Sequence, residues 1–211
     1  MSSTDATRKQ LGFLIRYSLQ SASIIVLLAI FLRVFVLSSY VMSGASMLPS
    51  IWPGDFLVAL KWGTQGAKRG EVVALHCPGA RDRTCLKRVV GVAGDRIEFQ
   101  GGKLIVNGES AQKRQISKEI SVEAVGRRSW LIWPSEPAAG VKEPLIVPPG
   151  HVYLLNDKRV DGEDSRSWGP VPVSELEGKA RFVWLSLDWF EEGRVRDWPR
   201  PRWHRMLRSI D

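Results

Sequence analysis

The stretch of sequence that decides the fold lies at residues 71–95 and reads Glu71-Val-Val-Ala-Leu-His-Cys-Pro-Gly-Ala-Arg-Asp-Arg-Thr-Cys-Leu-Lys-Arg-Val-Val-Gly-Val-Ala-Gly-Asp95. Its two apolar segments, residues 71–75 and 86–90, are rich in Val and Leu and lie on either side of a polar turn. β-branched residues that flank a turn are typical of antiparallel strands. We therefore expect a β-hairpin at this point of the chain.

The same pattern continues on both sides of this hairpin. Turn signals recur, and short apolar segments lie between them at residues 56–60, 96–99, 103–106, 151–155 and 181–187. Many short strands with frequent turns indicate a mostly β domain, in which Asn107-Gly108 is the strongest hairpin turn. We expect residues 43–108 and 148–190 to form the β core. The more polar and less regular residues 109–147 are expected to form a small inserted subdomain.

Composition narrows the class of protein. The chain has 211 residues, 30 Lys and Arg against 22 Asp and Glu, a net charge of +8, and 44% hydrophobic against 25% charged residues. This apolar content excludes a disordered chain. A mean hydropathy of −0.10 excludes several membrane spans. The 19 Gly and 12 Pro residues show no period, which excludes a collagen-like repeat.

Residues 17–42 predict a membrane anchor. Residues 17–32 carry no charge, Arg33 interrupts, and apolar character resumes beyond it. A span needs about 20 residues, so the stretch suffices if Arg33 extends its long side chain to an interface. The alternative is a cleaved signal, because the small residues Ser43-Gly44-Ala45 could form a cleavage site. The apolar stretch is longer than the ~7–15 residues typical of such signals.

The flanking charges predict how the anchor is oriented. Arg8, Lys9 and Arg16 precede the span against the single Asp5. The positive-inside rule then keeps residues 1–16 in the cytoplasm and places the rest of the chain outside it.

Cys77 and Cys85 lie on the two sides of the hairpin turn. Outside the cytoplasm, a disulfide between them is plausible. Two reduced thiols are the simplest alternative. A metal site that also uses His76 is a weaker one, because no fourth ligand lies at a familiar spacing.

Residues 191–211 are basic and aromatic. Trp198 and Trp203 alternate with arginines, namely Arg194, Arg196, Arg200, Arg202, Arg205 and Arg208. Such interleaving occurs in proteins that bind nucleic acid. In an anchored protein it predicts contact with anionic lipid headgroups, with Trp at the interface. We expect lipid contact and no nucleic acid.

Three motifs point to chemistry. The first, Ser43-Gly-Ala-Ser-Met-Leu-Pro-Ser50, follows the predicted anchor, and the second is Lys87-Arg-Val-Val-Gly-Val-Ala-Gly-Asp95. The third lies at residues 156–170 and reads Asn-Asp-Lys-Arg-Val-Asp-Gly-Glu-Asp-Ser-Arg-Ser-Trp-Gly-Pro. None of the three histidines has a recognisable catalytic context, and the sequence has no Gly-rich phosphate loop.

In this order behind an anchor, the motifs resemble those of bacterial type I signal peptidase, also called leader peptidase. The resemblance covers residues 33–187 except 109–147. It implies a mostly β chain, with an N-terminal transmembrane helix before an antiparallel β-sheet catalytic domain. It also implies a place in the bacterial cytoplasmic membrane, with the catalytic domain on the extracytoplasmic side and no cofactor or metal.

The resemblance implies that Ser46 is the nucleophile and Lys87 its general base. A serine hydroxyl needs a base to take its proton, and a lysine serves only when its pKa falls from ~10.4 to about 7–8. Desolvation among apolar neighbours can lower this pKa. Because neighbours on a strand point to opposite faces, we expect Lys87 to point into the site and Arg88 to be solvated.

The oxyanion hole is assigned, also by resemblance, to the backbone N–H of Ser46. Some members add a serine hydroxyl where this chain has Gly44, so a backbone N–H there would have to serve, with Ser43 in reserve. Loss of one such donor costs about 10²–10³ in rate.

Supporting roles follow from the third motif. The resemblance implies that Asp164 and Arg166 form an ion pair behind the site, with Asp157 and Ser165 nearby and Arg159 at a further family position. Gly162 stands where the family usually has a serine that hydrogen-bonds the lysine.

Asn156 and Lys158 replace the family's usual Gly and Asn. The group that orients Lys87 is therefore not identified by the sequence, and Ser165 or a water is expected to substitute.

By resemblance, the substrate is the signal peptide of an exported preprotein, cut after a small-x-small motif. The implied partners are preproteins, the lipid bilayer and the secretion translocase. We also expect Met47, Leu48, Ile51 and Trp52 to form an apolar surface that dips into lipid. The alternatives are a specialised maturation peptidase of a conjugation system, a non-catalytic anchored binding module, and a self-cleaving repressor-type protease, which the anchor disfavours.

Overall fold

The computed structural model describes residues 3–134, 143–160, 163–191 and 194–210. It divides into two compact units, Met1–Leu37 and Ser38–Asp211. The first unit consists of helix α1 (Ser3–Phe31) and a π-helical turn (Leu32–Val36).

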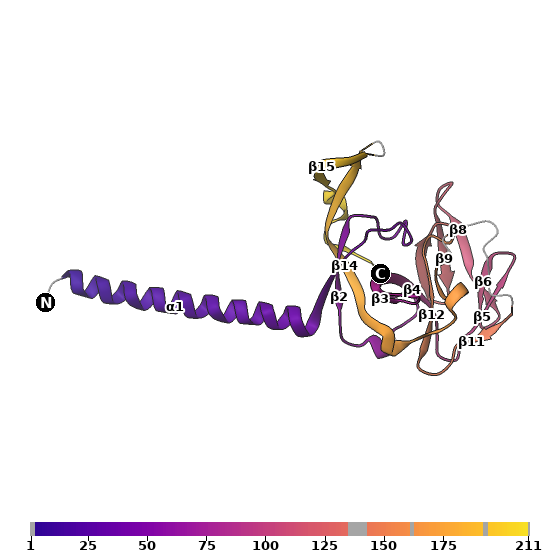
Figure 1. The fold of residues 1–211 in the computed structure, drawn as a ribbon, viewed down its shortest axis with the longest axis horizontal. Helices are drawn as coiled ribbons and strands as arrows, with labels where there is room; N and C mark the ends of the chain where they lie inside the picture. Colours follow the sequence, from indigo (N-terminus) through magenta and orange to yellow (C-terminus); the bar gives the residue numbers. More distant parts are fainter. Residues whose placement is uncertain (1–2, 135–142, 161–162, 192–193, 211) are drawn as a thin grey trace. The chain divides into compact units, whose positions relative to one another are not determined.

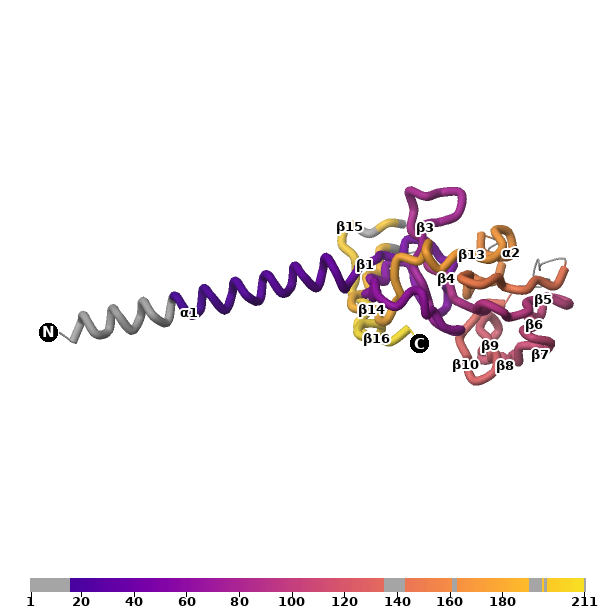
Figure 2. Tube along the Cα trace, turned by 90° about the horizontal axis from the view of Figure 1, so that it is seen from below, coloured from indigo at the N-terminus to yellow at the C-terminus, as the bar shows by residue number. Residues whose placement is uncertain are grey.

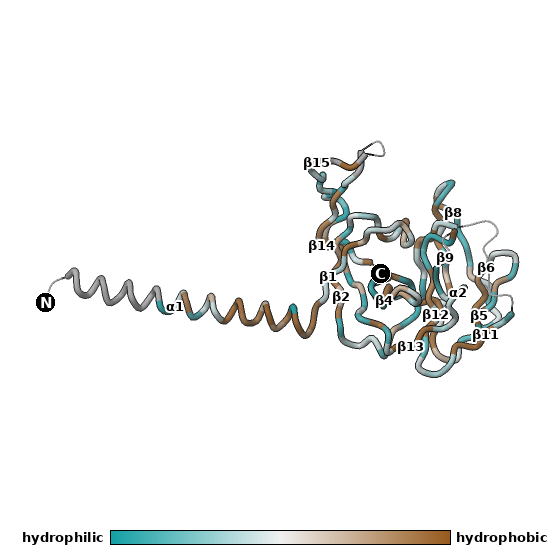
Figure 3. Tube along the Cα trace, viewed as in Figure 1, coloured by the Kyte–Doolittle hydropathy of each residue, from teal (hydrophilic) through white to brown (hydrophobic). Residues whose placement is uncertain are grey.

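The second half of α1 is apolar, as Figure 3 shows by its brown colour. Arg16–Val36 is a 21-residue stretch with a hydropathy of 2.3, long and apolar enough to cross a membrane. A signal sequence near the N-terminus would pass the same test. The apolar side chains along this stretch are exposed in the structure, so they need apolar surroundings that the unit itself does not supply.

Nearly all the regular elements of the second unit are strands (Figure 1). They are β1 (Leu37–Val41), β2 (Asp55–Leu60), β3 (Val72–Cys77), β4 (Ala80–Val92), β5 (Arg96–Gln100), β6 (Lys103–Val106), β7 (Glu109–Ser110), β8 (Gln112–Gln115), β9 (Ser121–Val125), β10 (Arg128–Ile132), β11 (Leu145–Ile146), β12 (His151–Leu155), β13 (Val171–Pro172), β14 (Leu176–Glu191), β15 (Arg194–Pro201) and β16 (Arg208–Ser209). The short helix α2 (Ser165–Trp168) and three 3₁₀ turns, at Thr64–Gly66, Val173–Glu175 and Trp203–Arg205, complete the unit.

The strands form three sheets within the described residues. The largest has the order β1-β2-β14-β3-β4-β12-β13, with β15 and β16 also paired to β14. The two smaller sheets are β11-β5-β6-β7 and β10-β9-β8. Figures 1 and 2 show the strands of these smaller sheets at one end of the unit, away from β1 and β14. The ladders are antiparallel, which confirms the predicted fold class.

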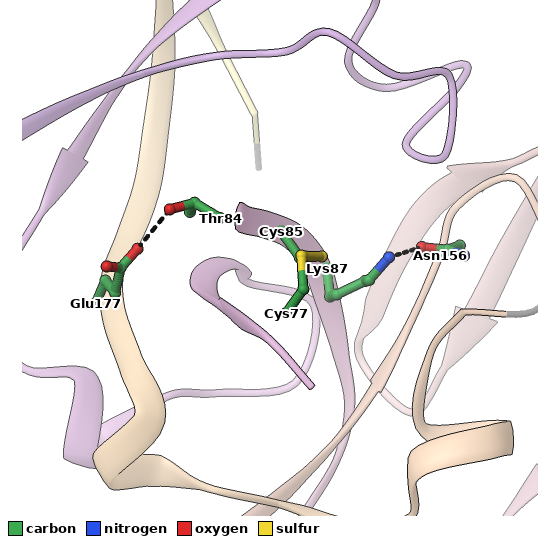
Figure 4. Close-up of a disulfide and its surroundings, with 6 residues drawn as sticks. All are labelled: Cys77, Thr84, Cys85, Lys87, Asn156 and Glu177. Atoms are coloured by element: carbon green, nitrogen blue, oxygen red, sulfur yellow. Dashed lines mark hydrogen bonds between the residues drawn. A yellow bond between two sulfur atoms is a disulfide. The ribbon is translucent and has the colours of Figure 1, made fainter. Parts of the chain in front are cut away.

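Both predicted hairpins are confirmed. Strands β3 and β4 pair with Leu75 opposite Cys85, and a disulfide joins Cys77 to Cys85 (Figure 4). Strands β6 and β7 pair across Asn107 and Gly108, whose φ angles of 55° and 81° are those that a two-residue turn between right-twisted strands requires.

The segment 109–147 contributes to two sheets. Strands β8, β9 and β10 make a sheet of their own, whereas β7 and β11 pair with β6 and β5. The sheet that contains β5 and β6 thus combines residues from both sides of the expected boundary at residue 108. Residues 135–142 lie outside the described part of the chain.

The middle of the large sheet is buried on both faces. Along β4 and β12, Val89, Val152 and Leu154 pack into one apolar cluster. Val90, Tyr153 and Leu155 point the other way into a second cluster, with residues of the two smaller sheets. A polar side chain in the buried part of β4, residues 86–91, therefore lies in the interior and needs a partner.

Asp55 is a buried hub at the start of β2. Its carboxylate accepts hydrogen bonds from the Trp52 N–H at 2.8 Å, the Ser186 hydroxyl at 2.6 Å and Arg205 Nη2 at 2.5 Å. Asp55 and Arg205 are both buried. The hub ties the loop before β2 to β14 and to the C-terminal segment.

This hub corrects the expectation that Arg205 meets lipid headgroups. Its guanidinium is inside the protein because Asp55 compensates its charge there. Arg202 is held as well, by Asp188 at 2.9 Å and the Pro53 carbonyl at 2.9 Å. The side chains of Arg194 and Arg196 lie outside the described part of the structure.

We predict that Arg205→Ala lowers the free energy of unfolding by about 3–5 kcal/mol, because it leaves the carboxylate of Asp55 buried without its cation. Denaturant titration of the purified chain measures the change. Arg81→Ala is the matched control, because Arg81 pairs with Glu175 at 4.0 Å on the surface. Equal midpoints for the two variants would contradict the assignment.

Asp95 closes the turn between β4 and β5. It accepts hydrogen bonds from the Val92 N–H at 2.7 Å, Asn107 Nδ2 at 2.8 Å and Arg69 at 2.6 Å. Burial alone would raise the pKa of Asp95, but these hydrogen bonds outweigh it and hold the pKa below its usual value of 3.8.

A carboxylate with a lowered folded-state pKa stabilises the protein above its unfolded pKa, and this contribution disappears as the pH falls through the lower folded value. We therefore expect wild type to be more stable than Asp95→Asn at pH 7, and the gap to narrow below about pH 4. Unfolding titrations at pH 7, 4.5 and 3 measure the gap. A gap that stays constant over this range would rule out the linkage.

Candidate active site

Ser46 lies in the loop between β1 and β2. The loop is folded on itself by hydrogen bonds from the Leu48 N–H to the Ala45 carbonyl at 3.1 Å and from the Ile51 N–H to the Met47 carbonyl at 2.9 Å. Met47 and Ile51 are fully buried in the apolar cluster beneath the loop. With its neighbours anchored in this way, Ser46 stays at the surface, partly exposed.

The buried positions of Met47 and Ile51 show that one expectation was wrong. These side chains belong to the core and do not form a surface that dips into lipid. The loop is short and its apolar side chains fit the space between β2, β3 and β14, where burial stabilises them more than exposure would. Trp52 is the one exposed member of the expected group, at 40%.

Lys87 lies in the centre of the large sheet, on β4, opposite Val73 of β3. Its side chain is only 3% exposed, although lysine is rarely buried. The amine donates a hydrogen bond to Asn156 Oδ1 at 2.6 Å (Figure 4) and lies 5.3 Å from the centre of the Trp168 ring.

Arg88 was expected to be solvated, and this prediction was wrong. Arg88 does point away from Lys87, but it is only 2% exposed because the β8–β10 sheet covers that face, with Trp130 against the guanidinium. Asp157 pairs with Arg88 through two hydrogen bonds of 2.7 Å. Arg88 also donates to Ser50 Oγ at 3.2 Å, four residues after Ser46.

The segment 156–159 brings the two motifs together. The Lys158 N–H donates to the Ser46 carbonyl at 2.9 Å, and two residues earlier Asn156 accepts from Lys87. Two residues of chain span about 7 Å at most. The Ser46 backbone and the Lys87 amine are therefore held by neighbouring points of one short segment.

An ion pair and hydrogen bonds also hold the segment 156–159 and the strand before it in place. Asp164 and Arg166 form a buried pair at 2.7 Å, and Asp164 also accepts the Asn156 N–H at 3.1 Å. Ser165 Oγ accepts the Leu154 N–H at 2.9 Å.

Burial raises the pKa of the Tyr153 hydroxyl, and the charge of Asp164 raises it further. Gly162 lies outside the described residues.

Two residues of this arrangement were missed as site residues. Asn156 was noted only as a departure from a family pattern, although a side-chain acceptor in place of Gly was itself the signal. Glu123 lies in the segment that matches no motif, and it is fully buried in a pair with Arg159. The signal for Glu123 was its place on the inward register of β9, between Ser121 and Val125.

No cluster of three or more metal-ligating side chains occurs among the residues that the structure describes. The described residues bring to this site the hydroxyl of Ser46, the amine of Lys87 and backbone amides. Trp168, whose ring faces the Lys87 amine, also lines a cavity of about 290 Å³ together with His76, Cys77 and Pro170.

Comparisons with known proteins point to one family. Residues 15–185 match the family described as "Signal peptidase, peptidase S26". A signal peptidase I from Bacillus caldolyticus is 31% identical over 153 residues, which is 72% of this chain and 81% of that protein. One from Pseudomonas fluorescens is 26% identical over 217 residues, or 84% and 71% of the two chains. The crystal structure of a signal peptidase I from Enterococcus faecalis aligns with 25% identity and a TM-score of 0.37, covering 53% of this chain and 94% of that one.

We predict that Asp164→Ala lowers the free energy of unfolding by about 3–5 kcal/mol, because it leaves the Arg166 charge in the interior without this carboxylate. The double variant Asp164→Ala/Arg166→Ala should lose less than the two single losses added together, since it leaves neither charge unpaired. Denaturant unfolding of the four proteins measures the coupling. Strictly additive losses would contradict the pairing.

Proposed function

The chain belongs to the signal peptidase family of S26 peptidases, and on this premise we propose that it is a membrane-anchored serine endopeptidase that removes signal peptides from exported preproteins. In this proposal Ser46 is the nucleophile and Lys87 is its general base. This assignment rests on the position of the buried Lys87 amine. Asn156 accepts a hydrogen bond from this amine, and Lys158, two residues later, donates its N–H to the Ser46 carbonyl.

The reaction follows from these groups. Lys87 Nζ takes the hydroxyl proton of Ser46, and the oxygen attacks the scissile carbonyl carbon. Collapse of the tetrahedral intermediate breaks the C–N bond, and the Lys87 ammonium gives its proton to the leaving amine. A water, deprotonated by Lys87, then hydrolyses the ester on Ser46 and releases the signal peptide.

The burial of Lys87 supports this use of a lysine. Removal from water disfavours the ammonium form, and an amine that is neutral near physiological pH is what a general base requires. The arginines nearby could not take this role, because a guanidinium does not lose its proton in proteins.

The developing oxyanion needs donors. We assign the Ser46 N–H and the Gly44 N–H, which belong to the exposed side of the loop. Among the described residues no protein acceptor takes the Ser46 N–H, so it is available for a substrate oxygen. The absence of a side chain at Gly44 leaves open space there, since a Cβ atom added to Gly44 would meet only Met42 Cε, at 4.0 Å.

Membrane anchoring by residues 16–36 fits a substrate that is itself membrane-bound. The excess of positive charge before the span supports a cytoplasmic N-terminus. Exposed aromatic side chains near the C-terminus, Trp198 at 85% and Trp203 at 74%, support contact of this segment with lipid headgroups.

We predict that Ser46→Ala abolishes cleavage and that Lys87→Ala lowers the rate by at least about 10²–10⁴-fold, the usual contribution of a general base. The assay follows cleavage of a labelled preprotein by the full chain in detergent. Ser110→Ala and Lys103→Ala remove the same groups from exposed positions of the β5–β7 sheet and should leave the rate unchanged. Cleavage that survives in the Ser46 and Lys87 variants would refute the dyad, and a wild type that cleaves no preprotein would favour the binding module.

We also predict that kcat/KM of the wild type rises with pH through one ionisation, because only the neutral amine accepts the serine proton. Initial rates measured from pH 5 to pH 10 give the profile. A flat profile over that range would exclude an ionising base.

A further inference from the structure

Asn156 holds the amine on which the proposed chemistry depends. Its Oδ1 accepts a hydrogen bond from Lys87 Nζ at 2.6 Å, and both side chains are buried (Figure 4). We propose that Asn156 is the positioning residue of the general base, which orients the Lys87 amine toward the nucleophile. This inference rests on the proposed function and names a residue that the resemblance did not assign.

The backbone of Asn156 is fixed at both of its polar groups. Its N–H donates to Asp164 Oδ2 at 3.1 Å, and its carbonyl accepts from Arg159 Nε at 2.9 Å. Asp164 is in turn paired with Arg166, and Arg159 with Glu123. Because each of these partners is itself held in a buried ion pair, Asn156 cannot shift without breaking one of them.

An amide oxygen suits this task because it carries no charge. A neutral primary amine has two N–H groups and one lone pair. When one N–H is given to Asn156, the direction of the amine is set while its lone pair remains for the proton of Ser46. A carboxylate in the same place would orient the amine equally well, but it would favour the ammonium form and raise the pKa of the lysine by about 1–3 units.

The sequence pattern agrees with this assignment. By resemblance, the lysine of the family is hydrogen-bonded by a serine where this chain has Gly162, and the position of Asn156 is usually Gly. This chain therefore lacks the usual hydroxyl and carries an additional acceptor, and the structure places that acceptor on the amine. Ser165, the other expected substitute, uses its oxygen to accept the Leu154 N–H.

Two variants of the full chain test the proposal in the preprotein assay. Asn156→Leu removes the acceptor and should lower kcat by about 10–100-fold, which is the usual effect of losing a residue that orients a reacting group. KM should change little, because Asn156 does not touch the substrate in this proposal. Asn156→Asp keeps the volume and the acceptor but adds a charge, so it should move the midpoint of the pH–rate profile upward by about 1–3 units.

Gln112→Glu is the matched control, since it makes the same amide-to-carboxylate change on the exposed strand β8 and should leave the profile in place. Asn156→Asp nearly preserves the shape of the side chain, so it decides the question even if Asn156→Leu fails to fold. A profile with the wild-type midpoint in Asn156→Asp, together with loss of activity in Lys87→Ala, would overturn the positioning role and leave the dyad intact. Activity retained in Lys87→Ala would instead overturn the proposed function itself.

Discussion

Three buried guanidinium–carboxylate pairs determine where the proposed site can form. Arg88 pairs with Asp157, Arg159 with Glu123, and Arg166 with Asp164. Each pair includes a residue of the segment between β12 and α2. The pairs with Arg88 and Glu123 tie this segment to β4 and to β9, and the third ties it to α2. Asn156, which accepts from the Lys87 amine, directly precedes Asp157, and Lys158, which donates to the Ser46 carbonyl, lies between Asp157 and Arg159. The placement of both groups that are proposed to react therefore depends on these pairs.

Such pairs do not make a protein stable merely by being present. Removing two charges from water costs several kcal/mol, which their attraction only repays when geometry and hydrogen bonding are good. They hold the segment in one arrangement, because each guanidinium is bound to a carboxylate at a fixed place in the fold. We infer that they fix conformation more than they add stability. The same reasoning applies to Asp55 and Arg205, which hold the other end of the Ser46 loop.

In this interior the arginines hold the structure together, and the lysine is the residue proposed to take part in the reaction. Arginine keeps its charge in any environment, so it serves for permanent pairing. Lysine can lose its proton when it is buried, and the Lys87 amine donates a hydrogen bond to the neutral amide of Asn156. An amide acceptor, unlike a carboxylate, does not itself favour the ammonium form of a lysine.

The local sequence pattern was sufficient to predict much of the secondary structure of this molecule. The alternation of apolar residues and the turns at Pro78-Gly79 and Asn107-Gly108 determine the β-hairpins, and an uncharged stretch before Arg33 determines the apolar helix, because these features depend only on neighbours in the chain. The positions of Ser46 and Lys87 within recognisable motifs also follow from the sequence. Only the tertiary structure decided that Arg88, Met47 and Ile51 are buried, that Glu123 belongs to the network and that Asn156 meets the amine. Strand alternation tells which side chains share a face, but whether that face is covered, and by which partner, depends on segments distant in sequence that pack against it.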